Sequence, residues 1–491
     1  MTRLYIDGMW REAASGQTRS ILDPGDGSEV ARVAEGGCED TESAIAAARK
    51  AFDAGPWRQT TWTQRADLLD DLADRVAAQR DELALVETRD TGKTVTESLW
   101  DMDDVAAVFR YYGRLAREQQ PAHLEAPGDN TTSVVVAEPV GVCALILPWN
   151  YPLLQASWKL APALAAGCTV VIKPSELTPL STLRMTELMH EMPIPAGVVN
   201  TVLGPGPTVG ATMAESHDVD LVSFTGGGAT GRRIMRAAAG NLKRIALELG
   251  GKNPHLIFAD ADLDLAVDAA LNGGLFHAGQ VCSAGARLLV EDTIADRFVA
   301  ALAKQMAAVR VGRGTVADTQ MGPLISAEHR EKVHRHVRQA VADGATLVVG
   351  GNMPADPDLA EGFFYPPTLL ADCTPDMAIT RAEVFGPVIS VERFATEDEA
   401  VARANDTEYG LAAGVRTNDE ERIARVTAAL RFGTVWANDY NIYFPQAPWG
   451  GFKQSGIGRE LGRVGLHEYL ELKHVFRNHA PAALRWFGDQ S

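Results

Sequence analysis

A cysteine among small residues marks the segment FHAGQVCSAGARLLV, residues 276–290. Gly279, Ser283 and Gly285 leave room for a substrate and the backbone to approach the sulfur of Cys282. A thiolate is a strong nucleophile, so Cys282 could attack an electrophilic carbon if a neighbouring group activated the thiol or took its proton. The alternative is that Cys282 is a buried small apolar residue, the usual role of a single cysteine.

Two further polar residues could serve carbonyl chemistry. Glu248 in LELGGK stands at the end of an expected strand, before two glycines, and its carboxylate could act as a general base. Asn150 in LILPWNYP ends another expected strand, and its side-chain amide could donate a hydrogen bond to an oxyanion. The alternatives are a solvated glutamate and an asparagine that only forms a turn.

A glycine-rich turn indicates a dinucleotide site. Gly226-x-Gly228-x-x-Gly231 follows an expected strand and opens an expected helix, which brings backbone and helix N-terminus close to phosphates. A ribose-binding carboxylate is expected about 20 residues further on. Glu248 lies near that spacing, so the pattern alone makes it a ribose ligand.

A second candidate for the ribose lies in VVIKPSELTP, residues 170–179. Lys173 ends an expected strand, and Glu176 could accept both hydroxyls of an adenosine ribose while its charge disfavours a 2′-phosphate. Alternatively, Ser175 or Thr178 caps the next helix, with Glu176 in its first turn.

The composition limits the partners. The 491 residues include 46 Lys and Arg against 64 Asp and Glu, a formal charge of −18, which argues against a nucleic-acid partner. An acidic surface could attract a cationic substrate, although an acidic face kept for solubility is the more common explanation. Five widely spaced cysteines predict no disulfide framework and a reducing, cytoplasmic location. We expect no signal segment or membrane contact, because Pro148 and Pro152 break the longest apolar run.

The N-terminal part is expected to be helical, and an α/β pattern follows. Helices are predicted over 41–54, 63–91 and 96–116, with Gly92 as a stop. In the third helix Trp100, Val105, Phe109 and Tyr112 form an expected buried stripe. Residues 133–146 predict two strands around a turn at 138–141. Two sets of expected strands alternate with helices, and this alternation predicts two parallel sheets. The strands of the first set are expected at 142–147, 169–174, 198–204, 220–226 and 244–249. Those of the second set are expected at 286–292, 346–351, 366–371, 388–394, 411–417 and 433–439. Residues 468–479 suggest a last strand.

The motifs PWNYP, IKPSE, FTGG, LELGGK, GQVC, EVFGPV and PWGGFKQSGIGRE, in this order, resemble the aldehyde dehydrogenase superfamily over nearly the whole chain. The resemblance implies that Cys282 is the nucleophile, Glu248 the general base and Asn150 the oxyanion donor, so Glu176 takes the ribose role. Many members have Ser where this chain has Gly227. The implied NAD-binding residues are Trp149, Lys173, Ser175, Glu176, Gly226, Gly227, Glu383 and Phe385.

The family architecture implies three units and a homo-oligomer. A Rossmann-like NAD-binding domain would comprise residues 1–122 and 142–249. A catalytic thiol domain would comprise 250–450. Residues 123–141 and 470–491 would form a β oligomerisation arm, giving a homodimer or homotetramer.

Within the superfamily, WDMDDVAAVFRYYG, WNYPLLQASWKLAPALAAG and FPQAPWGGFKQSGIGRELG are similar to betaine aldehyde and aminoaldehyde dehydrogenases. Aromatic residues at the matching positions would form a box for a cationic substrate, and Phe276 stands where these relatives often have Trp. Asp101 and Asp104 would attract an amine at the mouth of the tunnel, although paired acids on one helix face are usually solvated. The box residues are Tyr151, Trp158, Phe276 and Trp449.

Two further sites follow from the same similarity. Lys159 and Glu460 match a proton relay, with a structural ion pair as the alternative. Asp90 and the carbonyls of Asp23 and Leu177 match a potassium site.

The expected function is NAD-dependent oxidation of an aldehyde, through a thiohemiacetal and a thioester, to a carboxylic acid. The favoured substrate is a cationic aldehyde, either betaine aldehyde or an ω-aminoaldehyde. The alternatives are a general aliphatic or aromatic aldehyde dehydrogenase, in which the aromatic box is only an apolar tunnel, and a catalytically silent binding or structural protein.

Overall fold

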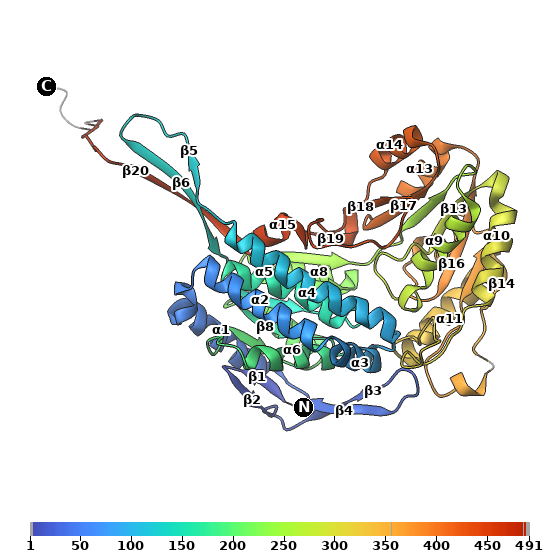
Figure 1. Cartoon of the computed structure of the whole chain (residues 1–491), viewed down its shortest axis with the longest axis horizontal. Helices are drawn as coiled ribbons and strands as arrows, with labels where there is room; N and C mark the ends of the chain where they lie inside the picture. The colour runs from blue at the N-terminus through green and yellow to red at the C-terminus, as the bar shows by residue number, and fades with distance from the viewer. Residues whose placement is uncertain (1–2, 355, 485, 488–491) are drawn as a thin grey trace.

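The computed structural model describes residues 3–354, 356–484 and 486–487, and three principal β-sheets organise this mixed α/β chain (Figure 1). The first sheet has the strand order β19-β11-β10-β7-β8-β9-β1-β2. Its five central strands are parallel, so their carboxyl ends meet at one edge. The strands are β1 Leu4–Ile6, β2 Met9–Arg11, β7 Val142–Ile146, β8 Thr169–Lys173, β9 Val199–Thr201, β10 Leu221–Gly226, β11 Arg244–Leu249 and β19 Gly456–Ile457.

Helices cover both faces of this sheet, and the alternation along β7 shows how. Cys143 and Leu145 belong to the apolar core shared with α2, α4 and α5, whereas Val142 and Ala144 face the core shared with α1, α7 and α8. The helices are α1 Cys38–Ala54, α2 Trp62–Ala78, α3 Arg80–Thr91, α4 Val95–Arg117, α5 Pro152–Ala166, α6 Leu180–His190, α7 Ala211–Glu215 and α8 Gly228–Ala238.

The second sheet has the order β14-β15-β16-β13-β12-β17-β18, with β14 antiparallel at one edge. Its strands are β12 Pro254–Ile257, β13 Arg287–Glu291, β14 Thr346–Val349, β15 Thr368–Ala371, β16 Val388–Phe394, β17 Ala412–Arg416 and β18 Thr434–Ala437. The helices that follow β11 in the chain are α9 Leu263–Leu275, α10 Asp292–Ala307, α11 Ala327–Ala342, α12 Ala378–Arg381, α13 Glu397–Asn405, α14 Glu420–Ala429 and α15 Gly462–His467.

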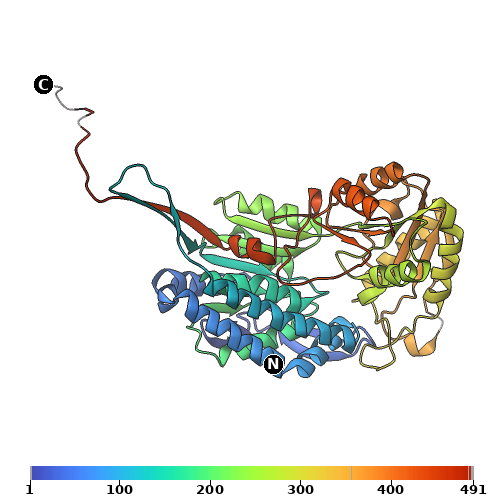
Figure 2. The ribbon, with the colours of Figure 1, turned by 45° about the horizontal axis from the view of Figure 1, so that its top comes forward.

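The third sheet is an arm of order β20-β6-β5, formed by β5 Ala122–Leu124, β6 Thr131–Pro139 and β20 Leu470–Asn478. It projects from the body in both views (Figures 1 and 2). The two strands predicted over 133–146 exist, but their pairing as a hairpin is wrong. β6 pairs with β20, while β7 enters the first sheet. The predicted arm residues 485 and 488–491 lie outside the described residues.

Several other expectations need correction. The N-terminal part is not purely helical, because β1 and β2 form an edge of the first sheet and β3 Thr18–Leu22 pairs with β4 Glu29–Ala34. The helix predicted over 63–91 is interrupted at Gln79, which caps both α2 and α3. Gly92 ends α3 as predicted, with a left-handed φ of 80° that suits glycine. Strand β12 was not anticipated.

The alternating strands themselves are confirmed, and the fold class is α/β as expected. The domain boundaries stay a prediction, although each sheet takes most of its strands from one predicted unit. Within the described ranges, no helix combines the length and the apolar character needed to cross a membrane.

Candidate active site

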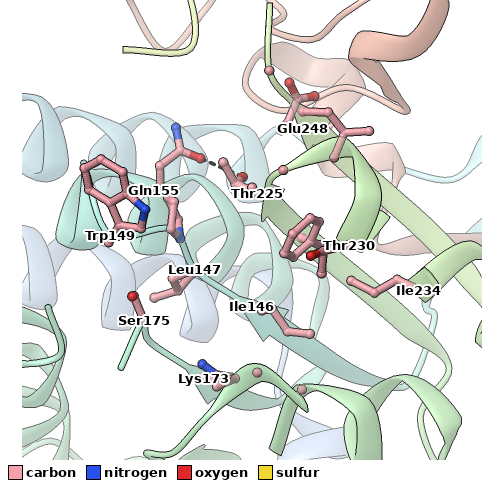
Figure 3. A pocket seen from close by; sticks show the side chains of 18 of the residues that line it. Ile146, Leu147, Trp149, Gln155, Lys173, Ser175, Thr225, Thr230, Ile234 and Glu248 are labelled. Atoms are coloured by element: carbon pink, nitrogen blue, oxygen red, sulfur yellow. Dashed lines mark hydrogen bonds between the residues drawn. The ribbon is translucent and has the colours of Figure 1, made fainter. Parts of the chain in front are cut away.

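A cleft of about 790 Å³ opens where the carboxyl ends of the first sheet's parallel strands face residues 282–385. Figure 3 shows Lys173 and Ser175 at one end of the view and Glu248 at the other, with Thr225 between them. The predicted nucleophile, base and oxyanion donor all line this cleft, as do the eight predicted cofactor residues. The fold therefore gathers at one edge residues that lie far apart in the sequence.

The nucleophile lies on a strained loop. His277 and Ala278 adopt left-handed φ angles of 48° and 52°, and Gly279 follows with 69°. A side chain at Gly279 would place its Cβ 2.2 Å from the carbonyl oxygen of Gly386, so only glycine fits. Burial, and then the charges of Glu248 and Glu383, raise the pKa of the Cys282 thiol to about 12. The thiol therefore needs a proton acceptor before it can attack.

Asn150 is held in place by the same loop. Its side chain is buried, and Nδ2 donates to the carbonyl oxygen of Gln280 at 2.8 Å. An amide nitrogen carries two protons, so the second N–H remains to meet an oxyanion. Because Gln280 lies two residues before Cys282, this bond ties the oxyanion donor to the nucleophile.

Glu248 lies on β11, opposite Thr225 of β10 and Gly456 of β19. Burial, followed by the nearby Glu460 carboxylate, raises the pKa of Glu248 well above its ordinary value. Its Oε2 has no hydrogen-bond partner among the described residues. The Oε1 atom of Glu248 lies close to Gly450, which has a φ of 150°. A Cβ at position 450 would lie only 2.8 Å from this oxygen, so glycine leaves the space that Oε1 occupies. Glu248 therefore has the environment of a general base rather than a ribose ligand.

The predicted pair Lys159 and Glu460 forms a buried ion pair beside Glu248. Lys159 Nζ also donates to Thr225 Oγ1 at 2.7 Å. Glu460 lies in a backbone bridge with Trp449. Its Oε2 is buried with no hydrogen-bond partner among the described residues. A relay through the pair stays a prediction, since a structural ion pair would look the same.

Lys173 and Glu176, the residues predicted to hold the adenosine ribose, line one part of the cleft. Lys173 Nζ lies 3.3 Å from Glu176 Oε2 and donates to Pro174 O at 2.9 Å. Burial opposes ionisation of Glu176, but the Lys173 ammonium and backbone N–H groups hold the pKa of Glu176 below its ordinary value. The capping alternative is wrong, because α6 begins at Leu180 without a side-chain cap. Ser175 Oγ instead accepts from Leu177 N at 3.2 Å.

The glycine-rich turn has the predicted strand-turn-helix form. β10 ends at Gly226, Gly227 is the N-cap of α8, and both line the cleft. A Cβ at Gly231 would lie 2.8 Å from Leu249 Cδ2, so this glycine lets α8 pack closely on β11. Because Gly227 has no side chain, only backbone N–H groups at this position could contact a bound phosphate.

The opposite end of the cleft contains Glu383 and Phe385. Glu383 Oε1 accepts a hydrogen bond from Gly251 N at 3.2 Å. A Cβ at Gly250 would lie 2.0 Å from Glu383 Oε2, so glycine at position 250 leaves room for this carboxylate. Burial raises the pKa of Glu383 to about 7. Two residues missed by sequence reasoning, His329 and Lys332, also line the cleft. Their segment resembles an ordinary solvated helix, so the sequence offered no signal.

Aromatic rings form a cluster on the thiol side. The Trp158 and Trp449 rings lie 6.3 Å apart, and Tyr443, which sequence reasoning missed, lies 5.0 Å from Trp449. Tyr443 could have been suspected from its aromatic-rich segment NIYFPQAPWGG. Tyr151 and Cys282 pack against the same apolar cluster. Phe276 instead stacks on Trp100 at 6.0 Å.

The third helix departs from prediction at Trp100, whose surface is 55% exposed, whereas Val105, Phe109 and Tyr112 are buried. Asp101 is also buried and forms an ion pair with Lys93, which neutralises part of its charge. Asp104 is half-buried. Burial, and then Asp103, raise the pKa of Asp104 to about 6. Neither acid is among the described residues that line the cleft, so their contact with a substrate stays a prediction.

Two of the three residues predicted to bind potassium, Asp23 and Asp90, accept backbone hydrogen bonds. Asp23 Oδ1 accepts from Gly25 N at 2.7 Å. Asp90 is fully buried, and Oδ2 accepts from Leu180 N at 2.9 Å, whereas Oδ1 has no hydrogen-bond partner among the described residues. Leu177 lies in the adjoining turn. An unpaired buried carboxylate oxygen fits a cation, and the site stays a prediction.

The chain belongs to the aldehyde dehydrogenase family, whose model matches residues 10–475. It is 56% identical to "Betaine aldehyde dehydrogenase" of Bacillus subtilis (strain 168), covering 99% of both chains. It is 44% identical to "Aminoaldehyde dehydrogenase 2" of Zea mays, covering 99% and 97%. A crystal structure of Staphylococcus aureus betaine aldehyde dehydrogenase in complex with NAD+ matches with a TM-score of 0.98 and 52% identity, covering 99% of this chain and 97% of that one.

Proposed function

We propose that this protein oxidises a cationic aldehyde to its carboxylic acid with NAD as hydride acceptor. The observation that carries the proposal is the convergence of Cys282, Asn150 and Glu248 on a dinucleotide-sized cleft next to an aromatic cluster. The relatives named for betaine aldehyde and aminoaldehydes support the substrate class. A cytoplasmic location is part of the proposal, supported by five free cysteines.

Nucleophilic attack forms the first bond. Cys282 releases its proton to solvent, and its sulfur adds to the aldehyde carbon, giving the oxyanion of a thiohemiacetal. The second N–H of Asn150 and the backbone N–H of Cys282 stabilise the oxyanion, an effect worth about 3–4 kcal/mol per donor in comparable sites. After oxidation to the thioester, Glu248 takes a proton from water, which attacks the acyl carbon and releases the acid and the thiol.

NAD, when bound, accepts the hydride of the thiohemiacetal carbon. Lys173 and Glu176 would hold its adenosine ribose, the turn at Gly226 its phosphates, and Glu383 with Phe385 its nicotinamide end. The ionised Glu176 favours NAD, because a 2′-phosphate beside it would meet a like charge. The cleft volume and its strand-end position fit a dinucleotide.

The aromatic cluster supports the cationic substrate. The rings of Trp158, Tyr443 and Trp449 pack against one another, and Trp449 lines the cleft together with Cys282. A desolvated cation over such rings gains up to about 2 kcal/mol.

Trp449→Ala is expected to remove most of the preference for a cationic aldehyde. The comparison uses betaine aldehyde and 3,3-dimethylbutanal, which share shape but differ by one charge. We expect kcat/KM for betaine aldehyde to fall about 30-fold more than for the uncharged isostere, as measured by NADH absorbance. Trp10→Ala, on the far edge strand β2, is the matched control. Equal kcat/KM for the two aldehydes in the unaltered protein would favour a general aldehyde dehydrogenase.

We also propose that the arm joins copies of this chain into a homodimer or homotetramer. β20 is an edge strand with exposed Leu472, Val475 and Phe476, an open template for pairing. Leu472→Glu combined with Phe476→Glu should shift the sedimentation coefficient toward that of a single chain. Arg477→Glu, which places the same new side chain at another exposed position of the strand, is the control. A single-chain sedimentation coefficient for the unaltered protein would contradict the proposal.

A further inference from the structure

The first turn of α11 contacts the thiol loop. Ser326 caps the helix by accepting from His329 N at 3.1 Å. One residue earlier, Ile325 N donates to Gln280 Oε1 at 2.9 Å. The carbonyl of Gln280 accepts from Asn150, as described above. The start of α11 is therefore fixed to the loop that carries the nucleophile.

His329 extends this contact to two more loops. Its Nε2 lies 2.6 Å from the carbonyl oxygen of Phe385. Because a carbonyl only accepts, Nε2 must hold the proton and donate it. The His329 ring also packs edge-on against Trp149, with centroids 5.5 Å apart, and Trp149 packs against Phe385 at 5.2 Å. One imidazole thus connects the nicotinamide end of the cleft with the strand end that carries Asn150.

The backbone at Phe385 requires such support. Its φ is 62°, a left-handed conformation that strains a non-glycine residue. The carbonyl oxygen of the next residue, Gly386, lies in close contact with Gly279 of the thiol loop. The turn from Glu383 to Gly386 is therefore strained, packed against the thiol loop on one side and bonded to His329 on the other.

We propose that His329 is a positioning residue that holds the Glu383–Phe385 turn in the geometry that hydride transfer needs. The inference rests on the proposed function and adds a residue to it. His329 acts through the Phe385 carbonyl and through Trp149, so it affects the nicotinamide end of the cleft without taking part in the chemistry at sulfur. Burial lowers the pKa of His329 to about 4, which keeps the imidazole neutral across the working range.

Three substitutions of His329 distinguish the contribution of its hydrogen bond to Phe385 from that of its ring contact with Trp149. His329→Leu removes both, His329→Phe keeps an aromatic ring against Trp149 without a donor, and His329→Gln keeps an N–H donor. Glu328→Leu places the same new side chain at an exposed position of the same turn and serves as the control. Thermal unfolding establishes that each variant is folded.

The readouts are the Kd of NAD from tryptophan fluorescence, the KM for NAD, and hydrolysis of p-nitrophenyl acetate. The ester needs the thiol and the oxyanion donor but no hydride acceptor. We expect His329→Leu and His329→Phe to raise the Kd and the KM for NAD about 10-fold, the effect of one lost hydrogen bond, with ester hydrolysis unchanged. His329→Gln should recover most of the affinity.

Unchanged NAD affinity in the Leu and Phe variants would overturn the proposal. So would a Gln variant as weak as Leu, or a parallel loss of ester hydrolysis, since both would mean that His329 only supports the fold. If the unaltered protein binds NAD but oxidises no aldehyde, the proposed function fails, while the NAD affinities still decide the role of His329.

Discussion

Glu248→Gln is expected to stop turnover after a single oxidation. Thioester formation should proceed and release one equivalent of NADH per active site in a burst, because oxidation precedes the step that needs Glu248. Hydrolysis should then fall by about 10²–10⁴-fold, the usual contribution of a general base. The isosteric amide cannot take a proton from water, yet it fills the space left by Gly450.

Stopped-flow NADH absorbance measures the burst, and mass spectrometry of the quenched protein detects the acyl group on Cys282. Hydroxylamine, which cleaves thioesters without a base, should restore turnover. Glu471→Gln on the arm serves as the control. A Gln variant that turns over at the unaltered rate, or one that shows neither burst nor acyl-protein, would contradict the assignment of Glu248 to deacylation.

The pH dependence of hydrolysis follows from the same residue. Burial raises the pKa of Glu248 well above its ordinary value, so the carboxylate form is lost at higher pH than for an exposed glutamate. Lowering the pH through that pKa protonates the base, and turnover should fall while the burst persists. The acid limb of the kcat profile should disappear in the Gln variant.

Cys282→Ala should abolish aldehyde oxidation by about 10⁴-fold or more, because no other group can form the thiohemiacetal. NAD binding, measured by fluorescence, should survive, since the cofactor residues do not depend on the sulfur. Cys38→Ala, at an exposed cysteine, is the control and should retain activity.

Alkylation supplies an independent measurement on the unaltered protein. Burial and neighbouring carboxylates raise the pKa of the Cys282 thiol to about 12. The thiolate fraction, and with it the rate of iodoacetamide labelling at Cys282, should therefore rise about tenfold per pH unit through the neutral range. A labelling rate already independent of pH near neutrality, or an active Ala variant, would contradict the role assigned to the thiol.

Several residues of the cleft could be predicted from the sequence because they follow parallel strands. Lys173, Gly226 and Glu248 each come at or near the end of a strand, and parallel strands present these ends at one edge. Short apolar runs predicted the strands. Because these strands are parallel neighbours, the three strand-end residues meet in one cleft. Periodicity and turn residues are local properties, so they were sufficient here.

Features that depend on distant parts of the chain could not be predicted. From its local pattern β6 reads as half of a hairpin with β7, and only the family resemblance, which groups residues 123–141 with 470–491, indicated an association with β20 at the other end of the chain. Trp100 fits a buried stripe, yet it lies exposed and stacks on Phe276, a partner that helix periodicity cannot reveal. His329 reaches the site only through tertiary packing, whereas Tyr443 lies in an aromatic-rich segment that could have drawn attention to it.

One continuous segment, residues 449–478, carries Trp449, Glu460 and the arm strand β20. Its parts are bonded together. Trp449 and Glu460 form a backbone bridge, Arg459 N donates to Glu468 Oε1 at 3.1 Å, and Arg244 anchors Leu470 through its carbonyl at 2.7 Å. Any contact that immobilises β20 therefore also restricts the residues beside the substrate and the base. If β20 joins copies of this chain, as proposed, the free energy of self-association and the affinity for the aldehyde are linked under mass action, and dilution of the protein is expected to weaken both together.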